Sequence, residues 1–78
     1  MTRRVSELTR LGLFILVNRL RPSDVSREAG ITRQHLGKLR FGEAEATRPM
    51  MVLIADACTL LLRREVTVPE LFDLENAR

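Results

Sequence analysis

Residues 24–42 read DVSREAGITRQHLGKLRFG, and they divide into two short amphipathic segments around one glycine, Gly30. Glycine adopts a left-handed backbone conformation at little cost and commonly ends a helix. Thr32 follows two residues later and is a residue type that caps the start of a new helix. Ile31, between the two, is expected to point into the core. The stretch therefore predicts two helices joined by a sharp turn.

The second segment carries polar side chains opposite its apolar face. Leu36 and Leu39 lie three residues apart and define the side that packs into the domain. The positions left exposed are Arg33, Gln34, Gly37 and Lys38. When an α-helix enters the DNA major groove, arginine can bind guanine O6 and N7, and glutamine can bind adenine N6 and N7. These four residues are the predicted base contacts, and Lys38 could also reach phosphate. The same side chains also suit a solvated helix face.

Phosphate contacts are predicted around the same segment. The start of a helix presents free N–H groups that bind phosphate, and basic or hydroxyl side chains add to them. The predicted phosphate contacts are Thr32, His35, Arg40, Arg21 and Ser23. A histidine such as His35 is also common as a plain surface or capping residue. Gly37 costs roughly 1 kcal/mol of helix stability relative to alanine, and its missing side chain would let the helix lie closer to the groove.

Five helices are expected along the chain, and no strand pattern is convincing. With their caps they cover about residues 5–20, 21–30, 32–42, 47–62 and 67–74. Ser6, Thr47 and Thr67 are the candidate N-caps of the first, fourth and fifth helices. Pro22 ends the first helix at or before Arg21. We therefore predict an all-α fold, a compact five-helix domain that contains a helix-turn-helix.

Two of these helices carry more apolar surface than one buried stripe requires. In the first helix, Leu8, Leu11 and Ile15 form the stripe expected in the core. A second strip on that helix consists of Leu13, Leu16, Val17 and Leu20. The fourth helix is apolar almost all round, so it is expected to be the central buried helix.

The composition limits the possible functions. The chain has 78 residues, which suits one domain over residues 1–78, with a core over about residues 8–74, and leaves little scaffold for a catalytic pocket. One cysteine, Cys58, and one histidine form neither a disulfide nor a zinc site, so we expect no metal and no cofactor. The longest apolar run, residues 11–17, is too short to cross a bilayer. We expect a cytoplasmic protein that is neither an enzyme nor membrane-bound.

The charge is distributed unevenly. Residues 1–42 contain nine lysines and arginines and three acids, a net charge of +6. Residues 43–78 contain four arginines and seven acids, a net charge of −3. Such polarity suits a domain that turns one face to a polyanion, and it also arises by chance in a short chain.

The stretch quoted above resembles the helix-turn-helix of the Cro/C1 (XRE-like, lambda-repressor-like) family. The positions that match the family pattern are Val25, Ser26, Gly30, Ile31, Thr32, Leu36, Leu39 and Gly42. Downstream, TRPMMVLIADACTLLL resembles the family's fourth helix, and VTVPELFDL resembles its short fifth helix. The likeness covers about residues 8–74. Pro22 is a departure, because the family often has a DNA-contacting glutamine there.

The resemblance implies a lambda-repressor-like fold and a sequence-specific regulator of transcription that binds double-stranded DNA. The minimal members of the family resemble this chain in length, so we expect a small repressor, encoded by a bacterium or a phage and associated with the nucleoid. No small-molecule ligand is expected. The alternative is a protein-interaction module or an antitoxin-type adaptor, whose partner site would be the surplus apolar strip of the first helix.

A homodimer is expected, because two copies are needed to bind a two-fold operator. The preferred interface is the C-terminal patch of Val68, Leu71, Phe72 and Leu74. This patch belongs to the acidic half of the chain, which would lie away from phosphate. The surplus strip of the first helix is the other candidate interface.

Overall fold

The turn at Gly30 forms as the sequence predicts. In the computed structural model, which describes residues 7–73, helix α2 (Pro22–Ala29) ends at Gly30, whose φ of 75° is left-handed. The N–H of Ile31 then donates to the carbonyl of Ser26 at 3.0 Å, which closes the end of the helix. Thr32 starts α3 (Arg33–Arg40), and its hydroxyl accepts the N–H of His35 at 3.0 Å.

Helix α4 (Arg48–Leu62) also begins and ends where the sequence predicts. The hydroxyl of Thr47 accepts the N–H of Met50 at 3.3 Å, and Pro49 occupies the first turn. The helix ends at Arg63, a non-glycine residue with a φ of 57°. The loop beyond it is held by the Thr59 hydroxyl, which donates to the Ala55 carbonyl and accepts the Val66 N–H, both at 2.9 Å.

Helix α1 (Arg10–Val17) is shorter at both ends than the predicted helix over residues 5–20. It starts at Thr9 because the Thr9 hydroxyl accepts the N–H of Gly12 at 3.2 Å; the predicted cap, Ser6, lies outside the described residues. It stops at Asn18 because Arg19 adopts a left-handed φ of 56°. Leu20 and Ile15 then close the end of the helix, since the Leu20 N–H donates to the Ile15 carbonyl at 3.0 Å.

Helix α5 (Val68–Leu71) is a single turn, shorter than the predicted segment that reaches residue 74. Glu70 caps it, because its carboxylate accepts the N–H of Thr67 at 2.8 Å. This hydrogen bond, assisted by Arg64 at 3.3 Å, lowers the pKa of Glu70 from its ordinary value. Phe72 is already extended, and Leu74 lies outside the described residues.

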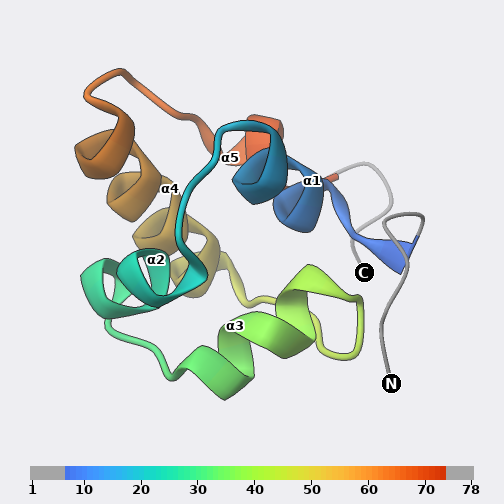
Figure 1. The fold of residues 1–78 in the computed structure, drawn as a ribbon. Helices are drawn as coiled ribbons and strands as arrows, with labels where there is room; N and C mark the ends of the chain where they lie inside the picture. The colour runs from blue at the N-terminus through green and yellow to red at the C-terminus, as the bar shows by residue number, and fades with distance from the viewer. Residues whose placement is uncertain (1–6, 74–78) are drawn as a thin grey trace.

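Helices from the two halves of the chain pack around one core (Figure 1), and the Cα radius of gyration is 11.4 Å. Helix α2 packs against α3 and α4, while α1 packs against α3 and α5. The largest fully buried side chains are Leu11, Ile15, Leu36, Ile54, Leu71, Val25 and Cys58. Ser26 is buried at the α2 face, and its hydroxyl donates to the Ser23 carbonyl at 3.0 Å, so a small polar residue is accommodated there. Burial also raises the pKa of the Cys58 thiol to about 11.

Helix α4 is not buried on all sides, which corrects the prediction of a fully buried central helix. Its core face contains Met51, Ile54, Ala55, Ala57 and Cys58. Its opposite face exposes Val52, Leu53 and Leu60, which keep 51%, 48% and 66% of their surface accessible. Apolar residues all round a helix therefore did not mean burial all round, because the main neighbours of α4 among the described residues, α2 and α5, do not cover every face of it.

Candidate nucleic-acid interface

The predicted base-contacting residues lie together on the exposed face of α3. Arg33, Gln34 and Lys38 are exposed, and Leu36 and Leu39 on the opposite face are buried. None of the three polar side chains makes a hydrogen bond or an ion pair with another residue in the range 7–73. In Figure 1, α3 lies along the lower edge of the molecule, with α1 and α5 above it. The polar groups of this face are therefore accessible to a ligand.

Gly37 leaves a gap in the same face. A Cβ atom built there would have no heavy atom within 4 Å beyond its own helix, so the fold does not require glycine for lack of space. Alanine is also the better helix former. The glycine therefore destabilises α3 with no packing contact that explains it, and this observation agrees with a close approach by a ligand.

Three of the predicted phosphate contacts lie at the starts of α2 and α3. Thr32 is exposed at the start of α3, and Arg21 is exposed at the start of α2. Ser23, in the first turn of α2, is half-buried. Both helix starts leave backbone N–H groups without helical partners, which favours an anion near them.

His35 and Arg40 differ from the others in their surroundings. The Nε2 atom of His35 lies 3.1 Å from the Sδ atom of Met50, so the ring is directed toward α4. The Arg40 guanidinium carbon lies 5.3 Å from the centre of the Phe41 ring. The Nε atom of Arg40 is buried without a hydrogen-bond partner among the described residues. The His35 ring therefore faces α4 and the Arg40 guanidinium lies near the Phe41 ring, and the phosphate contacts of both residues stay predictions.

The C-terminal end of α3 is bound by a residue that the sequence analysis had not singled out, Thr9. Its N–H donates to the Arg40 carbonyl at 2.8 Å. Its hydroxyl lies 2.9 Å from the Leu39 carbonyl and 3.0 Å from the Arg40 carbonyl, so it donates to this pair of oxygens. Contacts over about thirty residues of chain leave no local pattern in the sequence, which is why residue spacing did not reveal them.

Gly12 lies at the same junction. A Cβ atom on Gly12 would lie 2.7 Å from the carbonyl oxygen of Arg40 and 2.8 Å from a methyl carbon of Leu8. The absent side chain therefore allows the first turn of α1 to contact the last turn of α3. A glycine inside a predicted helix was the available signal, because glycine there often marks a close backbone approach.

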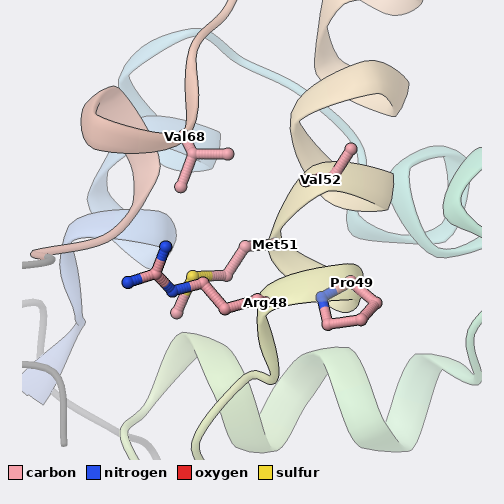
Figure 2. Close-up of a pocket in the computed structure, with 5 residues that line it drawn as sticks. All are labelled: Arg48, Pro49, Met51, Val52 and Val68. Carbon is pink, nitrogen blue, oxygen red and sulfur yellow. The ribbon is translucent and has the colours of Figure 1, made fainter.

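The predicted dimer patch is only partly accessible. Leu71 is fully buried, so its side chain belongs to the core of the single chain and is not available as an interface contact. Val68 and Phe72 are half-buried. Val68 borders a hollow of about 330 Å³ beside α4, which is also lined by Arg48, Pro49, Met51 and Val52. Figure 2 shows the Arg48 and Met51 side chains extending from α4 toward Val68.

Comparison with known proteins assigns no family to the chain. No family model, curated protein or solved structure matches it. Over residues 7–73, no helix has the length and hydrophobicity needed to cross a membrane.

Proposed function

We propose that this protein is a sequence-specific DNA-binding regulator of transcription with a lambda-repressor-like fold, in which α2 and α3 form the helix-turn-helix. The observation that carries the proposal is the exposed face of α3. It presents Arg33, Gln34 and Lys38 without internal partners, around the open position of Gly37. A helix with such a face fits the major groove, and its guanidinium and amide groups match the edges of guanine and adenine.

In this proposal the other residues position the helix on the duplex. Thr32 and the N–H groups at the start of α3 bind one phosphate, and Arg21 binds a second near the start of α2. Two copies bind a two-fold operator as a cytoplasmic homodimer and repress transcription by excluding the polymerase. No cofactor and no catalytic step take part.

The experiment is selection of bound sequences from fragmented genomic DNA by the purified protein, followed by titration of the selected site at several salt concentrations. We expect a preferred sequence with two-fold symmetry, and an affinity that falls steeply as salt rises because phosphate contacts release counterions. Recovery of random fragments, or binding that does not respond to salt, would contradict the proposal.

A second function, a protein-interaction module, is supported by the surplus apolar strip of α1. Leu13, Leu16 and Val17 keep 41%, 52% and 74% of their surface exposed. A partner helix with an apolar face would cover them. Under this function the strip variant Leu16→Asp would lose the partner, and Arg33→Ala would have no effect on binding.

A further inference from the structure

The four carbonyl groups at the end of α3 all have hydrogen-bond partners, and two of them obtain theirs from another helix. The carbonyl of Gly37 accepts the Phe41 N–H at 3.3 Å, and the carbonyl of Lys38 accepts the Glu43 N–H at 2.8 Å. These two bonds are local. The carbonyls of Leu39 and Arg40 are instead satisfied by Thr9, as described above. The last carbonyls of a helix otherwise need water or a local turn.

The arrangement joins two oppositely charged helix ends. The C-terminal end of α3 carries partial negative charge, and the N-terminal end of α1 carries partial positive charge. Thr9 lies between them and serves both, because its hydroxyl accepts the N–H of Gly12 from α1 at 3.2 Å and donates to α3. The Cγ2 atom of Thr9 also lies 3.5 Å from the place of a Cβ on Gly42, so the half-buried side chain lies beside the turn that follows α3.

Helix α3 is thus attached at both ends. Its N-terminal end is fixed by the turn from α2, and its C-terminal end by Thr9. The helix has eight residues and is about 12 Å long. A change of direction at one end of so short a helix displaces Arg33 and Gln34 at the other.

We propose that Thr9 is a positioning residue for DNA recognition. By holding the last two carbonyls of α3, it sets the angle at which Arg33 and Gln34 meet the base edges. This inference rests on the proposed function. It goes beyond the proposed function by assigning a determinant of operator specificity to the N-cap residue of α1, which lies at the end of α3 far from Arg33 and Gln34.

The test compares Thr9→Val, which keeps the shape of the side chain and removes its hydroxyl, with Thr9→Ser, which keeps the hydroxyl. Thr59→Val is the matched control, because the Thr59 hydroxyl also bonds three backbone groups but joins Ala55 to Val66. All proteins are studied at a temperature where circular dichroism shows them folded. The measurements are affinity for the selected operator, affinity for random DNA, and hydrogen exchange of the amides in the last turn of α3.

For Thr9→Val we expect the ratio of operator affinity to random-DNA affinity to fall about fivefold or more, the size of one weakened base contact. Affinity for random DNA should not change, because it depends on charge. Hydrogen exchange of the amides in the last turn of α3 should become faster. Thr9→Ser should restore the ratio, and Thr59→Val should leave it at the wild-type value.

Two outcomes would overturn the inference, and they differ in what they say of the function. If Thr9→Val keeps the wild-type ratio, the hydroxyl of Thr9 does not set the orientation of α3, and only this inference fails. If the wild-type protein shows no preference for any sequence, the proposed function fails together with it.

Discussion

Arg19 and Gly30 have the same role at the ends of successive helices. Both have a left-handed φ, 56° for Arg19 and 75° for Gly30. In both cases the N–H of the next residue donates back to a carbonyl of the last turn, from Leu20 to Ile15 and from Ile31 to Ser26. Only glycine adopts this conformation without steric cost, so α1 ends with residual strain and α2 does not.

We therefore expect Arg19→Gly to stabilise the domain by about 1 kcal/mol, the steric cost of one left-handed residue. Gly30→Ala should destabilise it by a similar amount, about 1 kcal/mol, although no atom within 4 Å would obstruct the new methyl group. Thermal and urea unfolding would measure both changes. Equal melting temperatures for wild type and Gly30→Ala would show that the left-handed turn is not present in solution.

Substitutions of the exposed side chains of α3 should affect DNA binding in different ways, depending on whether the side chain contacts a base or a phosphate. We expect Arg33→Ala and Gln34→Ala each to weaken operator binding by about 1–3 kcal/mol and to relax the preference at one base pair. Lys38→Ala should weaken binding more evenly across sequences and reduce the slope of log affinity against log salt by about one. All three side chains are exposed, so the melting temperature should not change.

Arg63→Gly is the control for these variants, because it removes one positive charge at the end of α4, where the backbone is already left-handed. It should leave the preference for each base pair unchanged. A loss of base preference in this control, or wild-type binding by Arg33→Ala and Gln34→Ala, would contradict the assignment of α3 to the major groove.

At the scale of the element, two glycines inside helices have opposite environments. Gly12 lies against the carbonyl oxygen of Arg40, and Gly37 faces open space. Gly37 occupies the interior of α3 and Gly12 the first turn of α1. In a helix interior alanine is favoured over glycine by roughly 1 kcal/mol. Whether a glycine-to-alanine substitution raises or lowers the free energy of unfolding should therefore depend on the space around the residue.

We expect Gly37→Ala to raise the free energy of unfolding by about 1 kcal/mol and, if α3 enters the groove closely, to weaken operator binding. Gly12→Ala should lower the free energy of unfolding by about 1–3 kcal/mol, because the methyl group would separate α1 from α3. Urea unfolding of the two variants in parallel provides the measurement. A stabilising Gly12→Ala would show that the two helices do not meet as described.

The helices that the sequence predicted correctly begin and end at residues that act through contacts within the same turn. Gly30, Thr32, Thr47 and Pro49 act within their own turns, so residue type and spacing located α2, α3 and α4. The start of α1 was wrong because Thr9 is placed by a contact with α3 that lies about thirty residues away. Local preferences do not contain such information.

In the candidate site, too, the sequence predicted what depends on local spacing and did not predict what depends on other elements. The period of the helix placed Arg33, Gln34 and Lys38 on the exposed face of α3, because Leu36 and Leu39 had to face the core. The directions of neighbouring side chains depend on other elements: the histidine ring is set by Met50, and Leu71 is buried by the whole fold. Residue spacing could not predict these.

At the scale of the whole molecule, the exposed apolar residues lie on two separate helices. Helix α4 exposes Val52 and Leu53, and Val52 borders the hollow that it shares with Val68. Helix α1 exposes Leu13, Leu16 and Val17. With Leu71 buried and Leu74 outside the described residues, the described part of the proposed C-terminal interface consists of Val68 and Phe72, and the hollow beside α4 extends it.

We expect Val52→Asp to reduce the dimer population and to weaken operator binding, because a charge at the rim of the hollow would lose solvation in the interface. Val52 is half exposed, so the folded monomer should persist. Leu13→Asp, the matched change on α1, should leave the dimer intact. Sedimentation of both variants decides between the surfaces, and a monomer produced only by Leu13→Asp would assign the interface to α1.

The bonds from Thr9 to Leu39 and Arg40 also determine an order of events during synthesis. Helix α1 leaves the ribosome before α3, and an isolated helix of eight residues is not stable in water. The carbonyl groups that receive Thr9 exist only after residue 40 has been added. We therefore expect the first helix of the chain to become ordered only after residue 40 has been added, when the N-terminal segment can close a loop of about thirty residues onto α3.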